Sequence, residues 1–259
     1  MKLTIAKIGW FVCLGALAVL SISAINHKKD GTLTDVDVRI EEFDGGAFFL
    51  TEQDVRNEVM DIIVEPGNHL IRDIETDDIE SALYTNPFIR DVNVYVTSDG
   101  ILNVTVSQRE PILRVFDAKG KTYYIDREGL SIPVSEYFTA RVPIATGHIN
   151  VTTQEETAEG EETDWSRFHR LVLAIDDDPF FKSLTEQLDV SKNGQITIIP
   201  AVGDLKIIFG HAENIDVKLE NLKATYKQLF EHGGWDTYET IDLSYSGQVV
   251  CKKKPNLKS

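Results

Sequence analysis

The residue types that could do chemistry are present in this sequence, but their spacing does not bring them together. The histidines are His27, His69, His148, His169, His211 and His232. None of them belongs to a closely spaced pair such as H-x-x-x-H, which could hold a metal ion on one helix. No G-x-S-x-G, phosphate-binding loop or dinucleotide-binding glycine pattern occurs. The sequence therefore predicts no catalytic residue, no metal ligand and no cofactor.

Two acidic runs are the next candidates for a chemical role. Asp176, Asp177 and Asp178 precede Pro179, but three consecutive carboxylates cannot supply the two opposed groups that glycoside hydrolysis needs. We interpret this run as a helix cap. The longer run, Thr152 to Asp164, lacks the ordered oxygen ligands and the glycine of a calcium-binding EF-hand loop. We expect a solvated, self-repelling loop there.

The composition argues against further classes of partner and site. The formal net charge is −16, which argues against a nucleic-acid partner, because phosphate binding needs a basic surface. A chain of 259 residues, 42% of them hydrophobic, can form one or two domains, each with its own core. Cys13 and Cys251 lie near opposite ends of the chain, so they predict neither a disulfide framework nor a zinc site.

One apolar stretch, residues 8–25 (IGWFVCLGALAVLSISAI), contains no charged residue and is about as long as a helix must be to cross a bilayer. We expect an uncleaved transmembrane helix. Residues 1–7 would then be a short cytoplasmic tail, and residues 26–34 a linker to the bulk of the chain on the other side of the membrane. A cleaved signal peptide is the alternative, with Ser21-Ile22-Ser23 as its cleavage site, although the apolar run is longer than a usual signal core.

The next part of the chain predicts the order β-α-α-β-β. Asp35 to Glu42 alternates as a strand, and Thr51 caps the first helix. The second helix begins near Thr76 and stops at Asn86-Pro87, because proline disfavours helical geometry in the residue before it. Two alternating strands then flank Asp99-Gly100, which we expect to supply the positive φ angles of a tight hairpin turn. These elements predict a three-stranded sheet with two helices on one face.

A second, β-rich stretch follows. Its helices are predicted around 165–175, from Pro179, and over 214–230, where apolar residues recur at helical spacing. Its strands are predicted over 112–116, 122–126, 141–146, 188–190, 196–199, 205–209 and 240–252. Asn193-Gly194 marks a hairpin between two of them. We expect Thr240 to Lys252 to form the last strand, at the border of the sheet.

Several motifs resemble a known family. The run Asn86 to Val92 (NPFIRDV) and the exit Val104 to Pro111 (VTVSQREP) are similar to a POTRA (polypeptide-transport-associated) domain. The segments YYIDREG, PIATG and IDLSY, in this order after it, resemble the β domain of the bacterial FtsQ/DivIB family. Ser244 stands where the family usually has arginine. The resemblance implies an α+β fold: a transmembrane helix, a POTRA-like domain over 35–109, a mixed β-sheet domain with flanking helices over 110–252, and a basic tail over 253–259.

The resemblance also implies a non-catalytic role in the division complex. Family members bind the coiled-coil partners FtsB and FtsL, and through them act on FtsW and its transpeptidase partner in septal peptidoglycan synthesis. Tyr245 falls on the family's partner-contacting tyrosine. The expected partner-binding residues are Tyr245, Ser246, Gly247, Gln248, Val249 and Val250, along an edge that another chain can complete as an added strand. Tyr245 could instead simply pack as a strand aromatic.

Two other functions stay open from the residues. A POTRA-bearing adaptor for outer-membrane protein export or assembly usually carries repeated units or a membrane barrel, and this sequence has one unit. An anchored cell-wall hydrolase would need a reactive pair that the sequence does not offer.

Overall fold

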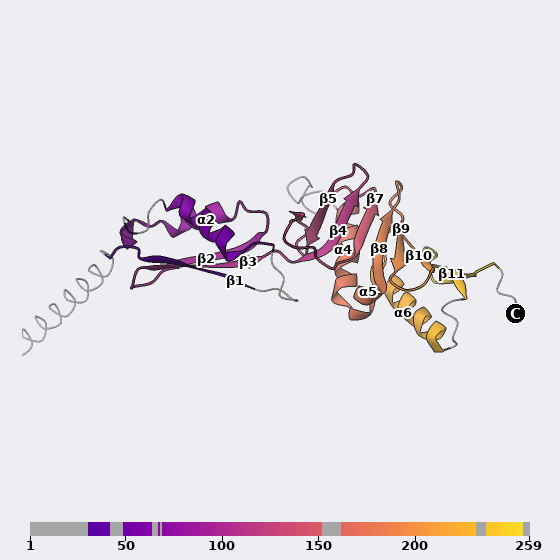
Figure 1. Cartoon of the computed structure of the whole chain (residues 1–259). Helices are drawn as coiled ribbons and strands as arrows, with labels where there is room; N and C mark the ends of the chain where they lie inside the picture. The colour runs from indigo at the N-terminus through magenta and orange to yellow at the C-terminus, as the bar shows by residue number, and fades with distance from the viewer. Residues whose placement is uncertain are drawn as a thin grey trace, which may run out of the picture. The chain divides into compact units, whose positions relative to one another are not determined.

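Figure 1 shows the computed structural model of the chain. It describes residues 31–41, 49–63, 67, 69–151, 162–231 and 237–255. The chain divides into two compact units between Arg109 and Glu110. The predicted transmembrane helix over 8–25 lies outside the described residues, as does most of the acidic run. Within the described ranges, no helix has the length and apolar character needed to cross a bilayer.

The first unit has the predicted β-α-α-β-β order. Its elements are β1 (Asp35–Glu41), α2 (Glu52–Ile62), the short 3-10 helix η2 (Ile71–Asp73), α3 (Thr76–Leu83), β2 (Ile89–Val96) and β3 (Ile101–Gln108). The strands lie in the order β1-β3-β2. β3 is therefore central, parallel to β1 and antiparallel to β2.

Alternation and capping explain why these residues form these elements. Thr51 accepts a hydrogen bond from the Asp54 amide (3.1 Å), and the Asp54 carboxylate accepts one from the Thr51 amide (2.8 Å). This reciprocal cap satisfies donors that the first turn of α2 would otherwise leave unpaired. Alternate strand residues and the inner faces of both helices are buried in one core, which includes Val55, Ile79 and Val104.

The turn between β2 and β3 differs from the expected one. Gly100 has a φ of +86°, but Asp99 is not among the residues with positive φ, so the expectation for Asp99 was wrong. The Gly100 amide donates to the Thr97 carbonyl (3.1 Å), and the Thr97 amide donates to Ile101 (2.9 Å). The loop is thus longer than a two-residue hairpin turn, and in loops of this kind only the last residue takes the left-handed conformation.

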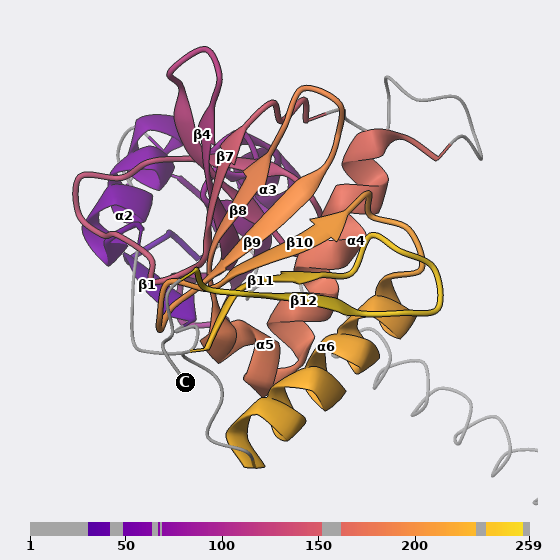
Figure 2. The ribbon, with the colours of Figure 1, turned by 90° about the vertical axis from the view of Figure 1, so that its right-hand side faces the viewer.

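The second unit is a nine-stranded sheet with the order β12-β11-β10-β9-β8-β7-β4-β5-β6. Its strands are β4 (Pro111–Asp117), β5 (Thr122–Asp126), β6 (Ser131–Pro133), β7 (Ile144–Gly147), β8 (Thr185–Val190), β9 (Ile196–Pro200), β10 (Lys206–Gly210), β11 (Tyr238–Asp242) and β12 (Val250–Lys253). The helices are α4 (Asp164–Asp177), α5 (Pro179–Leu184) and α6 (Ile215–Glu231). Figure 2 shows all three on the same side of the sheet.

A single row of side chains crosses this sheet beneath the helices. The strand registers align Val115, Ala145, Leu188, Ile198, Ile207, Ile241 and Cys251 on seven neighbouring strands. Six of these residues are in the buried core, and Cys251, at the end of the row, is partly buried against it. The core therefore extends as far as β12, which is the last strand on that side.

The final strand differs from the expectation. The pattern from Thr240 to Lys252 predicted one strand, but the structure divides it into β11 and β12, which pair antiparallel as a hairpin. The Asp242 carboxylate accepts hydrogen bonds from the Ser244 amide (2.8 Å) and hydroxyl (2.6 Å). Gly247 takes a φ of +75°. A local side-chain turn and a left-handed glycine thus reverse the chain where alternation suggested that it continues.

Candidate functional site

The most distinctive feature of the second unit is the free border of its sheet. β12 pairs with β11 on one side, and no strand of the described residues pairs with its other side. Figure 2 shows β12 as the outermost ribbon of this border. An unpaired strand presents backbone amides and carbonyls that a strand from another chain can satisfy. This border is therefore the candidate site.

The border strand is held firmly in place from both ends. Leu243, only 2% exposed, donates its amide to the Ile208 carbonyl (2.8 Å) and so extends the pairing of β11 with β10. At the other end, the Lys254 amide donates to the Thr237 carbonyl (3.0 Å). The β11–β12 hairpin is consequently fixed to the core before any partner arrives, which lowers the entropic cost of binding.

The side chains of β12 and the residue after it are mainly basic. Lys252 forms an ion pair with Glu239 (2.9 Å), and Lys254 lies 3.7 Å from Asp204. Lys253 is exposed. Burial raises the pKa of the Cys251 thiol, which disfavours the reactive thiolate. The strand therefore offers hydrogen bonding and positive charge, and its cysteine is poorly suited to nucleophilic chemistry.

The sequence-predicted site residues lie next to this border, mostly outside the strand. Tyr245, Ser246, Gly247 and Gln248 are exposed in the loop between β11 and β12, with Tyr245 54% exposed. Val249 is partly buried against the core. Val250 alone of the six lies on β12. The expected strand from Thr240 to Lys252 included Cys251 and Lys252, but the expected partner-binding residues ended at Val250, whereas β12 continues to Lys253. Gly247 is a turn signal that could have shifted these residues towards the end of the strand.

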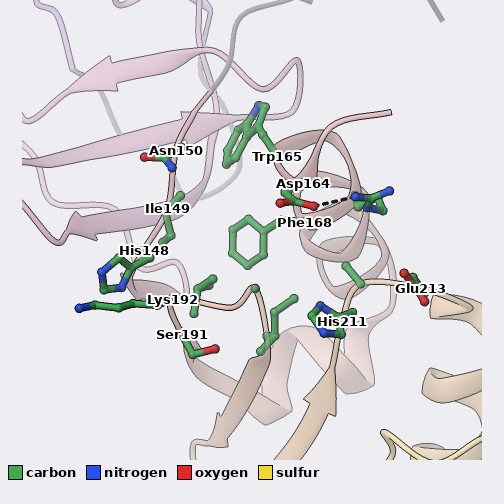
Figure 3. A pocket seen from close by; sticks show the side chains of 15 residues that line it. His148, Ile149, Asn150, Asp164, Trp165, Phe168, Ser191, Lys192, His211 and Glu213 are labelled. Atoms are coloured by element: carbon green, nitrogen blue, oxygen red, sulfur yellow. Dashed lines mark hydrogen bonds and ion pairs between the residues drawn. The ribbon is translucent and has the colours of Figure 1, made fainter. Parts of the chain in front are cut away.

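Besides this border, the second unit has a hollow at the end of the sheet where β7, β8 and β10 finish. It has a volume of about 210 Å³. Figure 3 shows His148 and Lys192 on one side of the Phe168 ring, and His211 with Glu213 on the other. Trp165 and Phe168 are buried, so the floor is apolar. Because its charges are mixed, the hollow has no clear preference for a ligand of either sign.

Charged side chains beside this hollow form ion pairs with one another. Arg167 donates to Asp164 (2.6 Å), a contact that raises the pKa of the arginine. Among the described residues, no group of three or more His, Cys, Asp or Glu side chains is placed to hold a metal ion. We see no nucleophile and base in contact around this hollow.

One residue of the aspartate run, Asp178, has the capping role that the sequence predicted, whereas Asp176 and Asp177 end α4. Asp178 accepts a hydrogen bond from the Phe180 amide (2.8 Å) and forms an ion pair with Lys223 (2.7 Å). The bond from Lys223 lowers the pKa of the Asp178 carboxyl most, followed by the bond from Phe180. Arg127 contacts both Asp176 and Asp177. A general acid needs a raised pKa, so Asp178 has the opposite tuning.

Comparison with known proteins agrees with this architecture. Residues 110–252 match the family model described as FtsQ/DivIB, C-terminal related, and residues 33–107 match that of the POTRA-like domain. The Cell division protein FtsQ of Salinibacter ruber is 28% identical over 163 residues, which cover 60% of this chain and 61% of the relative. The Cell division protein FtsQ of a Geobacter species is 25% identical over 196 residues, covering 73% of this chain and 68% of the relative.

The chain thus spans less than two thirds of the length of the first of these relatives. The C-terminal family model nevertheless covers more than half of this chain, and it includes the nine-stranded sheet except for Lys253, the last residue of β12. The POTRA-like match covers the three-stranded unit before it. The two family models match the two units of the structure in the order that the sequence predicted. The chain belongs to the FtsQ/DivIB family of cell division proteins.

Proposed function

We propose that this protein is a non-catalytic scaffold of the bacterial division complex. It sits in the inner membrane with its N-terminus in the cytoplasm and its two folded units in the periplasm. There it binds FtsB- and FtsL-type coiled-coil proteins and links them to septal peptidoglycan synthesis by FtsW and its transpeptidase partner. Family membership supports the division role, and the free border of the sheet supports the mode of binding.

The observation that carries the proposal is the open side of β12. The hydrogen-bonding groups of an antiparallel strand point alternately towards and away from its neighbour. The Lys254 amide points towards β11, since it donates to Thr237. Alternation therefore directs the backbone groups of Lys253 and Cys251 to the open side. A partner strand would add there by main-chain bonds, and side chains near it would provide specificity.

Strand addition makes a prediction that side-chain recognition does not. Replacing Lys253 by proline removes the amide hydrogen from the open side, because proline has no N–H. We expect Lys253→Pro to abolish capture of purified FtsB- and FtsL-type proteins by the full-length chain in detergent. Lys253→Ala, the matched control, should keep most of the capture. Equal capture by both variants would exclude pairing at this position.

Replacement of Tyr245 tests whether the loop before β12 contributes to partner binding. Its ring is largely exposed and stands just before the border strand, where it can cover an added strand. Tyr245→Ala should lose capture with no change in the thermal unfolding midpoint, because no core contact is removed. Full capture by this variant would remove Tyr245 from the interface and leave the role of the backbone intact.

A further inference from the structure

An apolar groove lies at the end of the second unit where β12 finishes. It is formed by Phe180 and Leu184 of α5, Val202 and Leu205 of the β9–β10 connection, and Tyr226 of α6, and it has a volume of about 570 Å³. Val202 is 67% exposed on its rim. Tyr226 is buried at the floor of the groove, and this burial raises the pKa of its hydroxyl to about 12. Open apolar surface of this kind commonly marks a binding site.

The groove is physically linked to the border strand. Lys254, the residue directly after β12, lies 3.7 Å from Asp204 through its side chain. Val202 is two residues from Asp204, a span of at most about 7 Å of chain. The carboxyl end of β12 and the groove rim therefore lie at the same end of the sheet, where a partner segment that flanks the added strand can reach across the end of β11 to the groove.

We propose that the groove receives a large apolar side chain, such as leucine or phenylalanine, from the partner segment that flanks the added strand. The inference rests on the proposed strand addition and extends it: the partner would be held by its backbone on β12 and by one apolar anchor in the groove. Such anchors in desolvated pockets provide much of the affinity of an interface.

A second copy of this chain fits the site poorly. Pairing of two β12 strands would bring together the lysines at positions 252, 253 and 254 of both copies. Like charges on paired strands are destabilising, and lysines on an edge strand are a common means of preventing self-association. The charge of this border instead favours a partner that carries carboxylates next to its apolar anchor.

Two exposed valines allow a matched test. Val202 lies on the groove rim, whereas Val217 is on α6, 57% exposed and outside the groove lining. Binding of the purified FtsB–FtsL-type complex to the full-length protein in detergent is measured by titration. We expect Val202→Lys to raise the dissociation constant about tenfold or more, because it removes one modest apolar contact with the partner. Val217→Lys should stay within about twofold of the unchanged protein.

The Lys253→Pro variant distinguishes failure of the apolar anchor in the groove from failure of strand addition to β12. Loss of binding by Lys253→Pro together with unchanged binding by Val202→Lys overturns the groove and retains strand addition. Unchanged binding by both variants overturns both. If Val202→Lys instead lowers the unfolding midpoint of the protein alone, the groove is already filled by its own chain, and the inference is wrong. Weakening by Val202→Lys with an unaltered midpoint supports it.

Discussion

The two borders of the nine-stranded sheet are built differently. β6 ends in Pro133, which has no amide hydrogen, and the segment after it, up to residue 143, has no regular structure. β12 contains no proline and is followed by one only at position 255. Short edge strands with proline are poor templates for pairing. The same sheet therefore has one blunted border and one that can accept a strand.

The supports of the two borders differ as well. The β5–β6 hairpin rests on His169 of α4, whose ring stacks on Trp165 with centroids 5.6 Å apart. The Nε2 atom of His169 is 3.4 Å from the Asp126 carbonyl. The β11–β12 hairpin is fixed by the buried leucine at position 243. A titratable group thus supports the blunted border, and an apolar side chain supports the open one.

The largest effect should come from removing that apolar support. Leu243→Ala should lower the free energy of unfolding by about 3 kcal/mol, because it leaves a cavity in a well-packed core. It should also weaken partner capture. Chemical denaturation measures the loss. Leu130→Ala at the β6 border is the control, since Leu130 is 42% exposed and should change stability by less than about 0.5 kcal/mol. Similar losses for both would contradict the comparison.

A pair of glycines gives an intermediate effect. Gly129, in the β5–β6 turn, has a φ of +82°, and a Cβ there would lie 3.3 Å from the His169 ring. Gly247, in the β11–β12 loop, has a φ of +75° and open space around it. Alanine at Gly247 should cost about 1 kcal/mol, from backbone strain alone. Gly129→Ala should cost more, because the ring must also move. The reverse order in urea midpoints would contradict this account.

The smallest effect concerns pH and should be confined to the β6 border. Burial lowers the pKa of His169, against weaker opposing effects of the Asp126 carbonyl and carboxylate. The unfolded chain then binds the proton more readily than the folded one. Stability should therefore fall as the pH drops below about 6.5, the usual histidine value.

Replacement of His169 by asparagine checks the sign of this pH effect. The stability difference between the original protein and His169→Asn should shrink on acidification from pH 7.5 to pH 5.5, because the variant has no proton to gain at this position. The difference is the useful quantity, since other groups titrate in both proteins. A difference that grows on acidification would mean that the protonated ring is favoured in the folded state.

The local pattern of residues in the sequence was sufficient to predict much of the fold. Alternation in β2 and β3, helical spacing in α6, and the cap at Thr51 all depend on neighbours in sequence, and each element was predicted. The break between β11 and β12 was missed because Ser244 to Gln248 keeps a plausible alternation. The chain reverses there with a hydrogen bond that the Ser244 amide donates to the Asp242 carboxylate. A side-chain turn competes with the strand in a way that periodicity does not detect.

The candidate site was predicted by its region and only in part by its residues. The position of β12 at the border depends on the parallel pairing of β10 with β11, two strands separated by the whole of α6. Such long-range pairing leaves no local mark on the sequence. The family resemblance supplied the neighbourhood of Tyr245, while the start of the edge strand at Val250 and its end at Lys253 required the structure.

The outermost place of β12 has a mechanical consequence. A tether attached alongside this strand and pulled parallel to it would load all the bonds of the ladder at the same time, in shear. A pull at right angles would open the same bonds one after another, like a zipper. Attachment at this border would therefore withstand tension along one axis and release along the other.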